Sequence, residues 1–311
     1  MKNEDLAAFF ERKFPGYTPR IVGSGSDSVA WRVGDNIVRC TRRNPTLYTR
    51  ESAVCNYIRP FISVDIPRIE TFTAGHSYCA IHPMIMGNAW SWHTFMFHPR
   101  RQRNLARSCA RFLVQLHGVD VAKLCHAVPE LRTGSPYIPF ERVADFFARF
   151  MSRRQMHCFE RHYNRIVANI PDGDMALVHL GLKGINSVVD AHGNLCGVFD
   201  FCNCGIFERW RDLVLMSLSR NRPLYREFLR EYERLSGRRP DRHRIADLRA
   251  IEFMWEKRWY FDGRFCPRSD RSTKKNIAGA LAHFYRWPRW TRRIIYLQLG
   301  LHDYLQRRAA E

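Results

Sequence analysis

VHLGLKGIN at residues 178–186, followed by VFDF at residues 198–201, is the stretch that decides the fold. The polar turn DAHGN at residues 190–194 separates two short apolar runs between them, which predicts a β-hairpin. Because the strands of a hairpin lie side by side, the residues just beyond its open end meet. The pattern therefore places Asn186 beside Asp200, and both side chains carry oxygens that suit a metal ion.

The region before this stretch is rich in predicted strands. Leu6, Phe9 and Phe10 have helical spacing and indicate a short opening helix. Glycine turns then separate short apolar runs. The predicted elements up to residue 87 are a helix at 5–13, a strand, glycine turn and strand within 21–33, a strand at 37–40, a helix at 48–58, and strands at 69–72 and 78–85. These elements predict a five-strand sheet with one inserted helix.

The rest of the chain is mostly helical in pattern. Its predicted helices cover residues 105–117, 140–170, 209–218, 223–235, 244–261 and 274–305, and the hairpin of 177–201 interrupts them. We therefore predict an α+β fold with two lobes. A small antiparallel-sheet lobe covers residues 1–87, a hinge lies near 84–87, and a larger helical lobe covers residues 88–311.

The order of these motifs resembles that of the aminoglycoside phosphotransferase and choline kinase family, which has a protein-kinase-like fold. That family carries His-x-Asp-x-x-x-x-Asn followed by Asp-Phe-Gly. Residues 177–186 and 197–201 are similar to this series, as are Gly205-Ile206 and Asp212-Leu213. The likeness covers about residues 20 to 215. It implies that Mg²⁺ and ATP or GTP bind in the cleft between the lobes.

The resemblance also assigns residues to the nucleotide. It places Gly23 and Gly25 in the loop over the phosphates, where a plain hairpin turn is the alternative. Arg39 stands where the family has a phosphate-holding lysine, paired with Glu51, and a plain ion pair is the alternative. The hinge, which contacts the adenine through its backbone, covers residues 81–86 and includes His82 and Met84.

Further assignments concern the metal and the loop that precedes it. By resemblance, Asn186 and Asp200 hold Mg²⁺, and Lys183 contacts the γ-phosphate. The same likeness gives His179 and Asp212 structural roles, holding and bracing this loop. A capping role for Asp200 and a solvated side chain for Lys183 remain as alternatives.

The main departure from the family pattern is at Gly181, where the family has the Asp that acts as catalytic base. Leu180 beside it replaces a small residue, which predicts a remodelled loop. Asp172 and Asp174 lie beyond an apolar strand segment and are poor substitutes. General acid–base participation contributes about 10²- to 10⁴-fold to rate, so its loss predicts severe impairment while metal and nucleotide binding survive.

Composition limits the remaining choices. At 311 residues and 45% hydrophobic residues, the chain is neither disordered nor fibrous. The formal net charge of +20 favours an anionic partner, such as a phosphorylated small molecule or an acidic protein. Acids at the N-terminus argue against a signal peptide, and no apolar run is long enough to span a membrane. Ten scattered cysteines suit a reducing compartment, so we expect a cytoplasmic protein.

These observations leave several functions open. We predict a pseudokinase that binds Mg-nucleotide. The alternative is an active ATP- or GTP-dependent phosphotransferase acting on an anionic or phosphorylated small molecule. Transfer of the nucleotidyl group is a less favoured alternative. Charge-driven binding of nucleic acid is another, and no compact recognition motif supports it.

Overall fold

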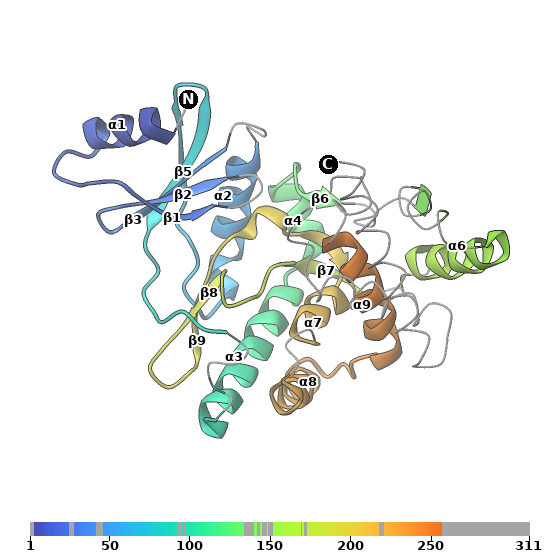
Figure 1. The fold of residues 1–311 in the computed structure, drawn as a ribbon. Coiled ribbons are helices and arrows are strands. Elements are labelled where there is room, and N and C mark those ends of the chain that lie inside the picture. The colour runs from blue at the N-terminus through green and yellow to red at the C-terminus, as the bar shows by residue number, and fades with distance from the viewer. Residues whose placement is uncertain are drawn as a thin grey trace, which may run out of the picture. The chain divides into compact units, whose positions relative to one another are not determined.

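The computed structural model describes residues 3–24, 28–41, 46–91, 95, 97–133, 140–141, 144, 148, 152–168, 170, 173–217 and 221–256 (Figure 1). The chain forms two compact units. The first contains Met1–Thr133, Ala176–Ile206 and Leu218–Arg239, and the second contains Gly134–Met175, Phe207–Ser217 and Pro240–Glu311. The predicted lobe boundary at residue 87 divides the chain differently and stays a prediction.

A five-stranded sheet dominates the N-terminal part of the first unit. Its strand order is β1-β2-β3-β5-β4, and every neighbouring pair is antiparallel. The strands are β1 (Arg20–Ser24), β2 (Val29–Val33), β3 (Asn36–Thr41), β4 (Glu70–Ala74) and β5 (Ser77–Pro83). Helix α2 (Leu47–Ile58) is inserted between β3 and β4. The predicted sheet and its inserted helix are confirmed.

Opposite faces of this sheet meet different helices. Helix α1 (Asn3–Lys13) buries Leu6 and Phe10 on one face, where the Phe10 ring meets that of Trp31 edge to face at 5.7 Å. Since strand side chains alternate between faces, the neighbours of Trp31 and Val38 point the other way. Ala30 and Arg39 therefore share the opposite face.

Helix α2 buries one stripe of side chains at helical spacing. The stripe consists of Tyr48, Glu51, Val54, Cys55 and Ile58. It follows the i, i+3, i+4, i+7 pattern of a core-facing helix, except that one member is a carboxylate. Glu51 is fully buried, so its charge requires partners inside the protein.

The predicted hairpin is present as β8 (Ser187–Val189) and β9 (Leu195–Val198). Asp190 closes its turn, because its Oδ1 accepts the backbone N–H groups of His192 and Asn194, both at 2.8 Å. Asp65 forms backbone hydrogen bonds with the outer edge of β9, and Asn88 forms them with the outer edge of β8. Beyond it, the 3-10 turn η2 (Phe201–Asn203) leads into β10 (Gly205–Glu208).

A three-stranded sheet, in the order β6-β10-β7, combines β10 with two strands that precede the hairpin in the chain. Its other strands are β6 (Arg132–Thr133) and β7 (Met175–Val178). β6 and β10 were not predicted, because short strands carry little periodicity of their own. They are defined by pairing between segments far apart in the sequence.

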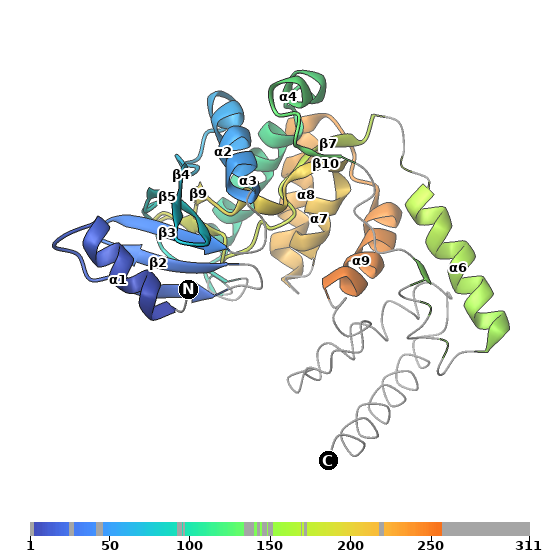
Figure 2. The same ribbon diagram turned by 90° about the horizontal axis from the view of Figure 1, so that it is seen from above.

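Helices complete both units. The first unit contains α3 (Pro99–His117), α4 (Val121–Ala127) and α8 (Arg222–Ser236), and α3 packs against α8 (Figure 2). In the second, α7 (Trp210–Ser217) packs against α9 (Arg242–Glu256), and α6 (Arg153–Ala168) is the helix described within the predicted 140–170. The predicted helices at 105–117, 209–218, 223–235 and 244–256 match these elements, while residues 257–261 and 274–305 lie outside the described part.

Helix α4 was missed by the sequence analysis. It has seven residues, too few for a clear periodicity, but Asp120 caps it by accepting the Lys123 backbone N–H at 3.1 Å. None of the described helices is both long enough and apolar enough to cross a bilayer.

Candidate nucleotide and metal site

One row of residues crosses the inner face of the sheet. Gly23 pairs with Ala30, Ala30 with Arg39, and Arg39 with Ala80. Directly opposed residues in antiparallel strands lie on the same face. Gly23 and Arg39 are therefore two strands apart, roughly 10 Å, with the small Ala30 side chain between them. Gly25 lies outside the described residues, so the second glycine of the predicted loop cannot be placed here.

Arg39 pairs with Glu51, as the sequence predicted. The guanidinium Nη2 donates to Glu51 Oε2, and the Arg39 guanidinium lies 5.1 Å from the centre of the Tyr48 ring. The Arg39 side chain is 11% exposed and that of Glu51 is 0% exposed. Burial opposes the charged form of Arg39, but the charges of Glu51 and Asp200 outweigh it and raise the arginine pKa. Arg39 therefore keeps its positive charge beside Glu51.

Glu51 also holds the segment around Asp200. Its Oε1 accepts the backbone N–H of Phe201 at 2.9 Å, and its Oε2 accepts the Cys202 thiol at 3.0 Å. Burial, followed by the nearby Glu51 charge, raises the pKa of Cys202, so the thiol keeps its proton and donates. Arg50 adds a bond from Nη2 to the Cys202 carbonyl at 2.9 Å. One face of α2 thus fixes both Arg39 and the Asp200 segment.

Cys202 was not singled out as a partner of Glu51 by the sequence analysis. The available signal was its place directly after the Asp-Phe pair. Glu51, Asp200 and Cys202 offer ligand atoms within 4.8 Å of one another. However, Arg39 Nη1 lies 3.4 Å from Asp200 Oδ1 and 3.6 Å from Cys202 Sγ. The guanidinium is therefore the cation that this cluster holds.

Asn186 and Asp200 meet at the open end of the hairpin. The Asn186 carbonyl accepts the Phe199 N–H at 2.9 Å, which continues the β8–β9 ladder by one step and places Asp200 next. Asn186 Nδ2 donates to the Gly181 carbonyl at 2.9 Å, leaving Oδ1 as the atom able to accept or coordinate. The Asp200 side chain is 40% exposed. An amide oxygen and a partly exposed carboxylate fit the ligand preference of Mg²⁺.

Asp200 has an unusual backbone. Its φ is 66° and its ψ is 62°, in the left-handed region that L-residues seldom adopt. Such strain costs on the order of 1–3 kcal/mol and persists where the surroundings impose it. Here the surroundings are the Phe201 N–H bond to Glu51 and the hairpin ladder on the other side. The carboxylate of this strained residue contacts Arg39 and is 40% exposed.

The loop before Asn186 contains a second strained residue. Leu180 has a φ of 57°, and Gly181 follows it with no side chain. A Cβ at position 181 would lie 3.0 Å from Asn186 Nδ2 and 3.2 Å from His179 Nδ1. The space beside Gly181 is therefore tight but not closed. His179 is fully buried, and its ring meets Phe201 edge to face at 4.6 Å; its structural role stays a prediction.

Lys183 and Gly184 form the outer part of this loop. The Lys183 carbonyl accepts the Asn186 N–H at 2.9 Å and the Ser187 hydroxyl at 2.7 Å. A Cβ at Gly184 would lie 1.8 Å from the Trp90 carbonyl oxygen, so only glycine fits there. Lys183 is half-buried, and its predicted contact with a phosphate stays a prediction.

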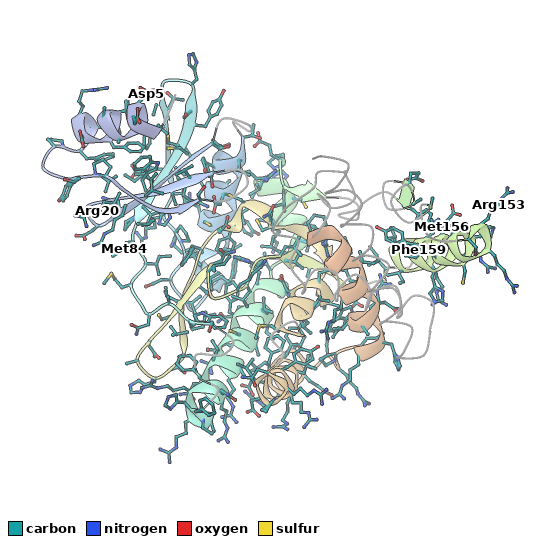
Figure 3. All side chains as sticks on the ribbon, in the orientation of Figure 1. Asp5, Arg20, Met84, Arg153, Met156 and Phe159 are labelled. Carbon is teal, nitrogen blue, oxygen red and sulfur yellow. The ribbon has the colours of Figure 1, made fainter. Side chains whose placement is uncertain are left out.

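The predicted hinge leaves the sheet at Met84, which Figure 3 labels. Met84 N–H donates to the Asp35 carbonyl at 2.7 Å, and Pro83 has no N–H to offer. His82 is buried, with Nδ1 at 2.8 Å from the Pro83 carbonyl, as expected of the neutral tautomer protonated on Nδ1. Asn88 then exchanges backbone bonds with Val189, which ties the hinge to the hairpin.

These features together match a known family. The sequence pattern that defines the phosphotransferase enzyme family covers residues 18–248 of this chain. The chain belongs to the phosphotransferase enzyme family. The match includes β1, Arg39, the hinge, Asn186, Asp200 and the helices that follow.

Solved structures of phosphotransferases share the kinase-like fold. ADP-bound aminoglycoside phosphotransferase APH(2'')-Ib has a TM-score of 0.66 at 16% identity, over 91% of this chain and 98% of that chain. The GDP complex of wild-type aminoglycoside 2'-phosphotransferase-IIIa has a TM-score of 0.64 at 14% identity, over 92% and 98%. Macrolide 2'-phosphotransferase MphH from Brachybacterium faecium has a TM-score of 0.56 at 17% identity, over 89% and 98%. The α+β, kinase-like fold is confirmed.

Asp212 and Asp174 belong to the second unit of this phosphotransferase-family chain. Asp212 is fully buried at the start of α7, and its predicted bracing role stays a prediction. Asp174 is buried too, and it accepts the Trp210 indole N–H at 2.7 Å. The expectation that Asp174 is a poor substitute for the missing base stays a prediction. Asp172 lies outside the described residues.

The buried His82 predicts a specific pH dependence of stability. Burial lowers its pKa, and the Arg39 charge acts in the same direction. An unfolded histidine has a pKa of about 6.5, so below that pH the unfolded chain gains a proton that the folded protein resists. Stability is therefore present above pH 6.5 or so and falls below it, at up to about 1.4 kcal/mol per pH unit.

We expect His82→Gln to lose less stability than the wild type between about pH 7 and pH 5. Urea unfolding of both proteins at several pH values tests this. Parallel plots of the free energy of unfolding against pH for the two proteins would show that His82 does not contribute to the pH dependence.

Proposed function

We propose that this chain binds a Mg-nucleotide, ATP or GTP, in its first unit and is impaired in phosphoryl transfer. The observation that carries the proposal is the arrangement around the hairpin end. Asn186 and Asp200 are held together there, Glu51 anchors the Asp200 segment and Arg39, and position 181 offers no carboxylate.

The phosphates would lie along the inner row of the sheet. Gly23 lets backbone N–H groups approach an anion, and Arg39 supplies a fixed positive charge on the same face. Arg39 is pre-positioned by Glu51, so little side-chain entropy is lost when the nucleotide binds. Asn186 Oδ1 and the Asp200 carboxylate would hold Mg²⁺, whose charge neutralises the phosphates.

The base of the nucleotide would contact the hinge backbone. Met84 N–H is engaged by Asp35 and Pro83 has none, so Ile85 is the residue whose N–H we assign to the base. Met84 would then contact the base only through its backbone carbonyl. His82, neutral and buried beside Pro83, would shape the floor of this position without adding charge.

Impairment follows from the same geometry. A hydroxyl acceptor needs a group that orients it and takes its proton, and Gly181 has no atom for this task. Binding and charge neutralisation require only Arg39, Asn186 and Asp200. We therefore favour a pseudokinase in which nucleotide is a structural or switching ligand.

The alternative is an active phosphotransferase with an atypical loop. Positioning and electrostatic stabilisation supply most of the acceleration in phosphoryl transfer, and the groups for both remain. Its acceptor would be an anionic or phosphorylated small molecule, since the chain carries a net charge of +20.

The nine cysteines of the described chain are free thiols, which supports our assignment to the cytoplasm.

Thermal unfolding with ATP and with GTP, each with and without Mg²⁺, tests the nucleotide site. Ligand at 100 times its dissociation constant adds about 2.7 kcal/mol, which is a clear rise in Tm. We expect a Mg²⁺-dependent rise in the wild type that Asp200→Ala abolishes.

The matched control is Glu70→Ala, which removes an exposed carboxylate from β4. This strand forms the edge of the five-stranded sheet opposite β1. It should keep the full shift. Equal loss in both variants would point to bulk charge, and no shift in the wild type would reject the nucleotide proposal.

A further inference from the structure

Two rows of arginine lie on neighbouring helices of the first unit. Helix α3 carries five arginines and no acid, and α8 carries four at every fourth position. All nine side chains are exposed: Arg100, Arg101, Arg103, Arg107, Arg111, Arg222, Arg226, Arg230 and Arg234. We call these nine residues the arginine face. Figure 3 shows side chains with nitrogen tips projecting outward from both helices.

The two rows run in the same direction. Arg107 Nε donates to Glu227 Oε1 at 2.8 Å, near the start of the contact. One turn further along, the pKa of Glu231 is lowered first by its bond with Arg234 and then by the charges of Arg107 and Arg111. Since later residues of α3 meet later residues of α8, the rows lie side by side rather than end to end.

Only part of this charge is neutralised. The two helices together carry nine arginines and three glutamates, which gives them a net charge of +6. Glu227 pairs with Arg107 and Arg230, and Glu231 pairs with Arg234. The other arginines of the face form no ion pair within the part of the chain that the structure describes.

The unneutralised charge gathers where both helices begin. Arg100, Arg101 and Arg103 lie in the first turns of α3, and Arg222 and Arg226 lie in those of α8. Positive side chains are unfavourable near a helix N-terminus, and like charges repel one another. These arginines therefore destabilise the folded protein when no ligand is bound. A bound polyanion would cancel the repulsion between them.

Several features narrow the kind of polyanion. Neither helix contains a lysine, and the planar arginine fork matches phosphate oxygens in pairs. Among the described residues, no exposed large apolar side chain lies within α3 or α8, so the two helices carry no wedge of the kind that an interfacial membrane helix inserts. One exposed aromatic side chain, Phe97, lies two residues before α3, and a single ring falls short of the series of aromatic side chains on which successive single-stranded bases stack.

We propose that the arginine face binds the phosphate backbone of double-stranded nucleic acid without reading its sequence. From Arg222 to Arg234 the row is roughly 18 Å long at 1.5 Å per residue. One strand of a duplex presents about five phosphates over that length. This binding is independent of the nucleotide site, which uses none of these residues.

The test is fluorescence anisotropy of a labelled duplex DNA of arbitrary sequence with the full chain, at several salt concentrations. Five neutralised phosphates give a slope of log K against log salt near −4.5, roughly a 500-fold loss of affinity from about 50 to 200 mM salt. The variant carries Arg103→Glu, Arg222→Glu and Arg226→Glu. We expect at least a tenfold weaker complex and a slope that is smaller by about 3.

The matched control makes the same charge change elsewhere on the first unit, with Arg12→Glu, Arg68→Glu and Lys123→Glu, all of which are exposed. It should keep most of the affinity and the slope. Should the charge-reversed variant fail to fold by thermal unfolding, Arg→Gln changes at the same three positions provide the second variant.

Three results would overturn the proposal. Equal weakening by the two variant sets would mean that net charge alone binds the duplex. No binding at about 50 mM salt would exclude it outright. Tighter binding to vesicles containing phosphatidylserine than to the duplex, lost in the arginine-face variant, would assign the face to a membrane instead.

Discussion

Replacing Glu51 with alanine lowers the free energy of unfolding by about 3–5 kcal/mol, the cost of leaving one member of a buried ion pair without its partner. Arg39 would lose its buried carboxylate partner and keep the partly exposed Asp200 at 3.4 Å, and the Phe201 N–H and the Cys202 thiol would lose their acceptor. Unfolding in urea, followed by fluorescence, measures the change.

Two further variants identify the cause. Arg39→Met combined with Glu51→Leu removes both charges and should recover most of the stability, because neither charge is then buried alone. Glu70→Ala, an exposed carboxylate on the same sheet, should change stability by less than about 0.5 kcal/mol. A loss for Glu51→Ala as small as that of the control would mean that Arg39 is solvated and the pair is dispensable.

Restoring the family loop should raise turnover by about 10²- to 10⁴-fold, the usual contribution of a general base. The variant is Leu180→Gly with Gly181→Asp. Leu180 holds a φ of 57°, which glycine adopts without steric cost, so Leu180→Gly relieves the strain beside the new carboxylate. The measurement is release of phosphate from ATP or GTP with Mg²⁺.

The single change Gly181→Asp should gain less than the double variant. Its Cβ would approach Asn186 Nδ2 at 3.0 Å, and the loop has little freedom to shift while Leu180 is strained. Gly181→Ala tests the added atom without a carboxylate and should give no gain. Wild-type turnover already equal to that of the double variant would show an active enzyme that needs no base at this position.

The sequence was sufficient for elements that are determined locally. The DAHGN turn produces a hairpin because Asp190 accepts two nearby backbone N–H groups, whatever surrounds it. The five-strand sheet followed from short apolar runs between glycine turns, and a helix was predicted at 48–58, where the structure has α2. Asn186 and Asp200 could be placed together for the same reason, since hairpin register is set within the segment itself.

Other features depend on contacts between distant segments. The thiol of Cys202 meets a carboxylate 151 positions away in the chain, on α2, and no local pattern indicates that contact. The short strands β6 and β10 exist because they pair with each other. The left-handed backbones of Leu180 and Asp200 are imposed by the packing around them, against the preference of both residues.

The sequence by itself was sufficient to predict the kinase-like fold, through the resemblance of residues 177–186 and 197–201 to the family series, and it shows that position 181 carries no carboxylate. The hairpin between these segments was predictable because its turn chemistry is local. The tertiary structure alone decided how charge is arranged. It buried Glu51 against Arg39 and Asp200, and it set the arginines of α3 beside those of α8. Charges interact through space over about 10 Å, so their partners are known only when the chain has folded.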